Sequence, residues 1–270
     1  MLRDITLGQY YPAKSKIHEL DPRVKLVATL IYIISLFILN NPIGFALATI
    51  FLIIAVKMSK VPFSFMVKGL RTIIILMLFT AVLNMVFTPG EEIFRIWKIS
   101  ISFEGVRAAG LMMIRLCYLI IGTSIMTLTT TPNRLTDGLE SLLKGLNKVK
   151  VPVHEIALMM SIALRFIPIL VEETDKIMKA QMARGADFES GGLIKKTKSL
   201  LPVLVPLFIS AFRRANDLAL AMESRCYMGG EGRTRMKPLK YSAGDIRTYI
   251  LLFIYLILMI ISRIIWGRLF

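Results

Sequence analysis

Residues 24–58 read VKLVATLIYIISLFILNNPIGFALATIFLIIAVKM, in which two apolar runs flank the turn Asn40-Asn41-Pro42. A helix needs about 20 mainly apolar residues to cross the hydrocarbon core of a bilayer, with a range of roughly 17–25. Both runs come close to that length, and the turn is too short for anything but an antiparallel helix pair. Pro42 also suits the first turn of the second helix. The stretch therefore predicts adjacent transmembrane helices over 24–40 and 42–58.

Three further apolar segments, 70–88, 108–130 and 246–266, have a similar length. The whole chain has 270 residues, is 55% hydrophobic, and has a mean hydropathy of +0.65 and a net charge of +16. A soluble domain of this length is usually less apolar and nearer neutral. We therefore predict an all-α integral membrane protein with about five transmembrane helices plus two to three long amphipathic cytoplasmic helices.

Basic residues orient the predicted helices in the membrane. Lysines and arginines precede the first span and crowd the stretch 132–245, while the first interhelical turn carries no charge. Because basic loops stay on the cytoplasmic side, we expect a cytoplasmic N-terminus, an external loop at 89–107 and an external C-terminus. Arg263 and Arg268 fit the last assignment poorly. The long apolar runs beside the basic stretch favour this interpretation over nucleic-acid binding.

The basic stretch contains two long helical patterns. Apolar residues recur at helical spacing over 152–183 and 200–225, with a linker at 185–199 and a shorter helix over 133–147. The apolar stripe of 200–225 is one-sided, which is typical of an amphipathic helix and not of a bilayer span. The predicted parts are a membrane part over 1–131 with four spans, a cytoplasmic coupling-helix domain over 132–242, and a C-terminal transmembrane helix over 243–270.

The two long helices end alike. Ala180-Gln-Met-Ala-Arg184-Gly185 closes the first and Ala221-Met-Glu-Ser-Arg225-Cys226 closes the second, 41 positions later. A cation at a helix C-terminus complements the helix dipole, and glycine is a common cap. Repetition on consecutive helices instead favours a pair of docking points, because guanidinium groups bind carboxylates and carbonyls with direction. The predicted docking residues for a two-fold partner outside the membrane are Ala183, Arg184, Gly185, Ser224, Arg225 and Cys226.

The sequence lacks the groups that catalysis or ion coupling would need. It contains no Gly-x-x-x-x-Gly-Lys-Ser/Thr phosphate loop, no carboxylate within a predicted span, and no nucleophile elbow or histidine cluster. We therefore predict no catalytic, cofactor-binding or metal-binding residue. Asn84 is interpreted as an interhelical hydrogen-bonding group. Arg115 stays open between an intramembrane functional charge and a side chain that reaches the outer interface.

Three elements of the chain match a known pattern. They are Leu20-Asp21-Pro22-Arg23-Val24-Lys25-Leu26 before the first span, Leu164-Arg165-Phe166-Ile167-Pro168 in the first long helix, and the two arginine tips. In these elements the chain resembles the transmembrane T component of energy-coupling factor transporters, ABC systems that import vitamins and metals, and the resemblance covers nearly the whole chain. In that family, arginines at such tips insert into grooves of two ATPase subunits. The second tip departs from the family's Ala-Arg-Gly, since it reads Ser224-Arg225-Cys226.

The resemblance implies a scaffold in the plasma membrane of a prokaryote, not an enzyme. Its partners would be two ABC-type ATPase subunits, which bind the ATP, and one small substrate-binding membrane protein, the S component. The coupling helices would pass ATPase motion to that protein and so drive uptake of a vitamin or other micronutrient. The implied contact face for the S component comprises Met159, Met160, Ala163, Ile167, Leu204, Leu207, Phe208 and Ala211. The alternative is a stand-alone membrane carrier or channel.

Overall fold

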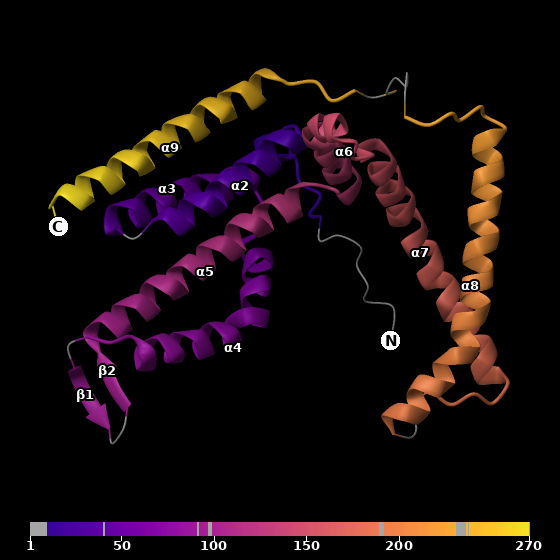
Figure 1. Cartoon of the computed structure of the whole chain (residues 1–270), viewed down its shortest axis with the longest axis horizontal. Coiled ribbons are helices and arrows are strands. Elements are labelled where there is room, and N and C mark those ends of the chain that lie inside the picture. Colours follow the sequence, from indigo (N-terminus) through magenta and orange to yellow (C-terminus); the bar gives the residue numbers. More distant parts are fainter. Residues whose placement is uncertain are drawn as a thin grey trace. The chain divides into compact units, whose positions relative to one another are not determined.

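The computed structural model describes residues 10–39, 41–90, 92–96, 99–188, 192–230, 236 and 238–269. These residues form two compact units, one drawn from 8–138 and 239–270 and the other from 139–238. The elements are α1 (Lys16–Glu19), α2 (Pro22–Ile38), α3 (Pro42–Ser59), α4 (Phe63–Phe87), β1 (Glu92–Ile96), β2 (Ile99–Ser102), α5 (Phe103–Thr129), α6 (Pro132–Leu143), a 3₁₀ helix (Lys144–Val149), α7 (Val153–Ala183), α8 (Leu193–Glu223) and α9 (Ala243–Leu269). Figure 1 shows the helical architecture, which confirms the predicted fold class.

Four of the described helices are long and apolar enough to cross a membrane. They are α3, α5, α7 and α9 as far as Trp266, and the number rises to five if the bent helix α4 is one span. Helices α3, α5 and α9 correspond to the predicted spans 42–58, 108–130 and 246–266. The expected number of about five spans is therefore confirmed, although the set of helices differs.

Two helices account for that difference. α2 has 17 residues and ends at Ile38. It has as many residues as the predicted span 24–40 but begins and ends two residues earlier. Its length of about 26 Å is less than the hydrocarbon core of about 30 Å. α7 was placed in the cytoplasmic part, while the sequence left open whether 152–171 enters the bilayer. It is apolar enough to span, because only Glu155 and Arg165 are charged over 153–170. Composition alone therefore does not distinguish a membrane span from an apolar helix that packs against a membrane partner.

Three predicted boundaries are corrected. α4 is bent by 58° between Phe63–Arg71 and Ile73–Phe87, so only its second part matches the predicted span 70–88. The expected loop 89–107 contains the antiparallel strands β1 and β2, which its β-branched isoleucines favour. α8 begins at Leu193, with the extended residue Gly192 at its N-cap, so the predicted linker 185–199 is partly helical.

Two polar side chains within the apolar helices have partners inside the protein. Asn84 of α4 donates to the Thr80 carbonyl at 2.9 Å and to the sulfur of Met112 in α5 at 3.0 Å, which confirms its predicted interhelical role. Arg115 of α5 donates to the carbonyl of Leu39, the C-cap residue of α2, at 2.6 Å. Carbonyls at a helix end lack intrahelical donors. Arg115 therefore caps α2, a role that the sequence interpretation did not consider.

The membrane-type helices share one apolar core, to which α2, α3, α4, α5 and α9 contribute. Its most buried members, each at most 3% exposed, are Tyr32, Leu36, Leu39, Ala48, Met66 and Leu128. Polar contacts also join these helices, and in one of them the Ser35 hydroxyl of α2 lies 2.8 Å from the Tyr255 hydroxyl of α9. The first helix of the bundle is thereby packed against the last.

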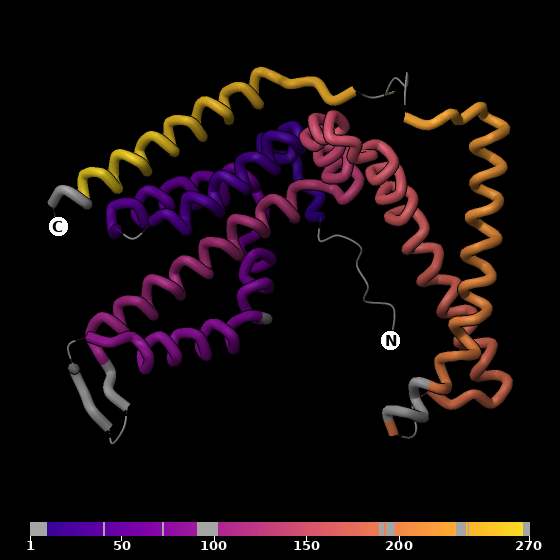
Figure 2. The backbone as a smooth tube through the Cα atoms, in the orientation of Figure 1, coloured from indigo at the N-terminus to yellow at the C-terminus, as the bar shows by residue number. Residues whose placement is uncertain are grey.

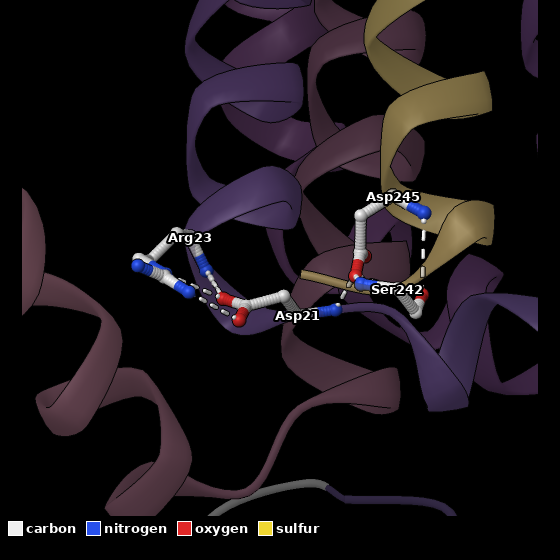
Figure 3. Close-up of polar contacts among 4 residues, drawn as sticks. All are labelled: Asp21, Arg23, Ser242 and Asp245. Atoms are coloured by element: carbon white, nitrogen blue, oxygen red, sulfur yellow. Dashed lines mark hydrogen bonds and ion pairs between the residues drawn. The ribbon is translucent and has the colours of Figure 1, made fainter. Parts of the chain in front are cut away.

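A buried polar cluster fastens the start of α9 to the start of α2 (Figure 3). Asp245 is only 1% exposed, and its Oδ1 accepts the backbone N–H of Asp21 at 2.8 Å. Its Oδ2 accepts the N–H and hydroxyl of Ser242 at 2.7 and 2.8 Å, a reciprocal arrangement like a capping box. Asp21 in turn caps α2 and pairs with the Arg23 guanidinium at 2.9 Å. Burial raises the pKa of the Asp21 carboxyl, but the hydrogen bonds and charge of Arg23 outweigh it and lower that pKa overall.

We expect Asp245→Ala to destabilise the protein, because it leaves the buried N–H of Asp21 and the part-buried N–H and hydroxyl of Ser242 without their acceptor. Each such donor costs about 1–3 kcal/mol. The melting temperature of the purified protein in detergent should fall by roughly 3–10 °C. Asp217→Ala removes an exposed carboxylate of α8 and serves as the control that should melt like the wild type. Equal melting of the two variants would show that the cluster does not hold α9 to α2.

Candidate functional site

Helices α7 and α8 have 31 residues each and pack as an antiparallel pair. Near the end of α7, the Gln181 side chain donates to the Pro202 carbonyl of α8 at 3.3 Å. Further along, Arg214 of α8 pairs with Glu173 of α7 at 3.0 Å. Figure 2 shows the two helices crossing, with α8 changing direction in its first half. Pro202 and Pro206 lie in that half, where missing backbone donors allow a helix to bend.

The first arginine tip ends α7 in a left-handed reversal. The N–H of Ala186 donates to the Gln181 carbonyl at 3.0 Å, and the N–H of Gly185 donates to the Met182 carbonyl at 2.9 Å. This pair of bonds is the Schellman motif. Gly185 has φ +89°, a conformation that glycine adopts without steric cost. Arg184 is thereby fixed as the last residue before the chain reverses.

The second tip ends α8 in the same way. The N–H of Tyr227 donates to the Met222 carbonyl at 3.0 Å, and the N–H of Cys226 donates to the Glu223 carbonyl at 2.9 Å. Cys226 occupies the left-handed position with φ +55°. Arg225 therefore stands at the position that Arg184 has on α7. The sequence repeat is a structural repeat, with a strained cysteine where the first copy has glycine.

All six predicted docking residues are exposed. Within the part of the chain that the structure describes, neither Arg184 nor Arg225 has an ion pair or a side-chain hydrogen bond. Each cation lies beside the negative end of its helix dipole, an interaction worth only about 0.3–1 kcal/mol at the surface. Capping alone therefore leaves both guanidinium groups with unused hydrogen-bonding capacity.

The two tips lie at opposite ends of the helix pair. Gln181, three residues before the first tip, contacts Pro202, whereas the second tip follows Glu223. A helix rises 1.5 Å per residue, so about 30 Å of α8 separates the two ends. A small anion cannot bridge that distance. The geometry therefore suits two separate binding surfaces, one for each arginine.

The predicted contact face for a membrane partner divides in the structure. Five of its residues are exposed: Met159, Met160, Ala163, Leu204 and Phe208. Ile167, Leu207 and Ala211 are half-buried. Ala211 lines a hollow between the two helices, together with Ile162 and Phe166 of α7. The predicted stripe on α8 thus mixed two faces, one turned to α7 and one exposed.

The exposed face of α8 is wider than the sequence interpretation suggested. Val205, Ile209 and Phe212, which it missed, are 54%, 55% and 70% exposed. They continue the helical spacing of Leu204 and Phe208, so five large apolar side chains form one stripe. A periodicity count that started at 201 would have found this stripe. An exposed apolar surface of this kind marks contact with lipid or with another protein.

A second missed feature joins the α8 tip to the start of α7. His154 was interpreted from the sequence as an isolated residue. Its Nδ1 atom lies 2.9 Å from Oε1 of Glu140, near the end of α6. Gly230, in the segment that follows the Arg225 tip, packs against the same ring, where an added Cβ would lie 2.5 Å from His154 Cδ2. Side-chain bulk at 230 is therefore excluded, and the segment after α8 stays close to the first turn of α7.

Two substitutions at the left-handed cap positions should change the stability of the two helix ends in opposite directions. Cys226→Gly relieves a left-handed non-glycine residue, whereas Gly185→Ala creates one, each changing the cap by about 1 kcal/mol. Hydrogen exchange of the Tyr227 amide should slow by about fivefold in the first variant, and that of Ala186 should accelerate by a similar factor in the second. Changes of the same sign in both variants would contradict equivalent caps.

Comparison with known proteins places this geometry in a family. The chain matches the cobalt transport protein family (CbiQ) over residues 13–236. It is 55% identical over 271 residues to the energy-coupling factor transporter transmembrane protein EcfT of Clostridium kluyveri, covering 99% of this chain and 100% of the relative. The proteins of the same name from Thermosediminibacter oceani and Bacillus subtilis are 51% and 48% identical, with 98% and 97% of this chain and all of each relative covered. The resemblance expected from the sequence is confirmed, and the chain belongs to the family of energy-coupling factor transporter transmembrane proteins.

Proposed function

We propose that this chain is the non-catalytic scaffold of an ATP-driven vitamin or micronutrient importer. It couples two ABC-type ATPase subunits to one small substrate-binding membrane protein and binds no nucleotide itself. The single observation that carries the proposal is the pair of equivalent helix ends, each presenting an exposed arginine at the same position of a Schellman motif. The names of the relatives, all transmembrane components of energy-coupling factor transporters, agree with it.

The separation of the tips supports two ATPase contacts. Arg184 and Arg225 lie about 30 Å apart along α8, so each enters its own groove in a different subunit. Guanidinium groups suit such grooves, because their planar fork holds carboxylates and carbonyls with fixed direction. The small neighbours Ala183, Gly185, Ser224 and Cys226 allow the groove walls to approach the helix end closely.

The apolar surface of the pair supports a contact with the substrate-binding protein. Met159 and Met160 of α7 are 61% and 41% exposed, and Leu204 and Phe208 of α8 are 44% and 61% exposed. Val205, Ile209 and Phe212 extend this surface beyond the face first expected. A partner that is itself apolar and membrane-embedded covers such a surface favourably, because burial gains about 25 cal/mol per Å² of apolar area.

The proposed mechanism moves the helix pair as a unit. ATP binding closes the ATPase subunits, and the two tips follow the grooves that hold them. The Glu173–Arg214 ion pair and the Gln181–Pro202 hydrogen bond keep α7 and α8 together during this motion. Their apolar surface then reorients the substrate-binding protein, so that substrate is released inward. In this arrangement the N-terminus is cytoplasmic and the C-terminus external.

The alternative function, a stand-alone carrier or channel, has less support than the scaffold function. It needs polar groups along a path through the spans, and the sequence offered only Asn84 and Arg115. Both donate hydrogen bonds within the protein. Asn84 donates to Thr80 and Met112, and Arg115 donates to Leu39. Transport by the purified chain alone in liposomes would favour the carrier over the scaffold.

The docking proposal predicts that Arg184→Glu with Arg225→Glu prevents assembly. Truncating or reversing a buried charged contact costs about 2–5 kcal/mol, so each site should lose at least about 30-fold in affinity. After co-expression with the two ATPase subunits and the substrate-binding protein, affinity purification through the variant should recover the substrate-binding protein without the ATPases. ATP-dependent uptake should be lost.

Matched controls separate docking from net charge. Lys179→Glu with Arg213→Glu makes the same charge change at exposed positions of α7 and α8, and this variant should assemble and transport like the wild type. The proposal is wrong if the tip variant assembles normally. It is equally wrong if the control variant loses the ATPases to the same extent.

A further inference from the structure

An apolar cavity of about 160 Å³ lies among α2, α3, α5 and α9, in the unit that contains the membrane-type helices. Its rim includes Ile54 and Met58 of α3 and Leu251 of α9, which are 52%, 39% and 59% exposed. The cavity therefore opens to the surroundings between these two helices. Both α3 and α9 are long and apolar enough to span a membrane, so the surroundings of the mouth are lipid.

Packed aromatic rings form one wall of the cavity. Tyr32 of α2 lies against Gly122 of α5, where an added Cβ would be 2.4 Å from the ring. The Tyr32 ring stacks on Phe51, and Phe51 stacks on Tyr255, with centroid distances of 5.8 and 4.5 Å. Three packed aromatic rings do not easily collapse into a neighbouring space. The cavity therefore persists unless another molecule fills it.

The lining determines what can fill it. Apolar cavities of about 150 Å³ stay dry and accept small hydrocarbons. Ala28 and Ala55 leave the cavity wide. Water gains few hydrogen bonds there, and the hydrocarbon available at a mouth in the bilayer is a lipid acyl chain.

One end of the cavity is cationic. Lys16 and Lys57 are exposed and directly precede the lining residues Ile17 and Met58, and α1 packs against α3. Lys14 and Lys60 add two more exposed cations to this end, against the single exposed carboxylate of Glu19 on α1. Lysines at a membrane surface attract anionic lipid headgroups.

We propose that this cavity is a binding site for an anionic phospholipid of the bilayer. One acyl chain enters between α3 and α9 and lies against Tyr32, while the phosphate group stays at the surface beside Lys16 and Lys57. The lipid fills a space between the first, second and last long helices of the bundle. The site is separate from the arginine tips and does not depend on their function.

Photolabelling tests this site directly. The full chain is placed in nanodiscs with trace phosphatidylglycerol that carries a diazirine on its acyl chain, and adducts are mapped by mass spectrometry. Labels are expected on the α3 segment around Ala55 and Met58 and on the α9 segment around Leu251. Ala55→Phe, which fills the cavity, should lower this labelling at least fivefold. Ala46→Phe, at an exposed position of the same helix, should leave it unchanged.

The headgroup is tested with a second lipid. Diazirine phosphatidylcholine should label the wild type several-fold less than phosphatidylglycerol, and Lys16→Gln with Lys57→Gln should abolish that preference. If Ala55→Phe fails to fold, Ala28→Leu provides the same test from α2. Undiminished labelling in a folded cavity-filling variant overturns the site, and equal labelling of the wild type by both lipids overturns its anionic character.

Discussion

The proposed coupling function depends on how the helices α7 and α8 end. Each ends in a reversal that needs one left-handed residue, Gly185 on α7 and Cys226 on α8. The residue before that reversal, Arg184 or Arg225, is the last one before the chain turns away from the helix. An arginine at this position is exposed, close to the negative helix dipole, and held by backbone hydrogen bonds. The backbone hydrogen bonds of the cap therefore fix the position of the arginine, and its side chain stays available to a partner.

Contacts between α7 and α8 join the two helices at more than one point. An ion pair and a hydrogen bond join α7 to α8 at separated points, and the His154–Gly230 contact joins the segment after the second tip to the start of α7. In the proposed mechanism a displacement at either tip is shared by both helices, because packed helices slide or rotate against one another and do not deform continuously. The apolar stripe of α8 lies on the same element, so a force applied at the tips reaches whatever covers that stripe.

Much of this could be read from the sequence, because the strongest signals were local. The turn Asn40-Asn41-Pro42, the apolar runs and the repeated arginine ends predicted the helices, their connections and the paired tips. Asn84 was correctly assigned to an interhelical bond, since an amide in a span has few other partners. The shorter helix predicted over 133–147 is present as α6 and the 3₁₀ helix that follows it.

What the sequence missed depends on contacts between distant residues. The Asp21–Asp245 bond joins positions 224 apart, and the capping of Leu39 by Arg115 joins positions 76 apart. The faces of α8 were confused because both are apolar, and only the position of α7 shows which one is covered. The bend in α4 lies at Thr72 and has no proline. Pro89-Gly90 signals a turn before β1, but Trp97-Lys98 between β1 and β2 carries no turn signal that would indicate a hairpin. The left-handed cysteine is a conformation that no residue-type preference predicts.

The most direct measurement of the central claim is cross-linking from both tips in the assembled transporter. A benzophenone amino acid replaces Ala183 and Ser224, the neighbours of the two arginines, separately and together. The account predicts that each single label attaches one ATPase subunit, and that the double label gives a species containing one copy of this chain and two ATPase subunits. Cross-links from both positions to the same ATPase copy, or only to lipid or to the substrate-binding protein, would contradict it.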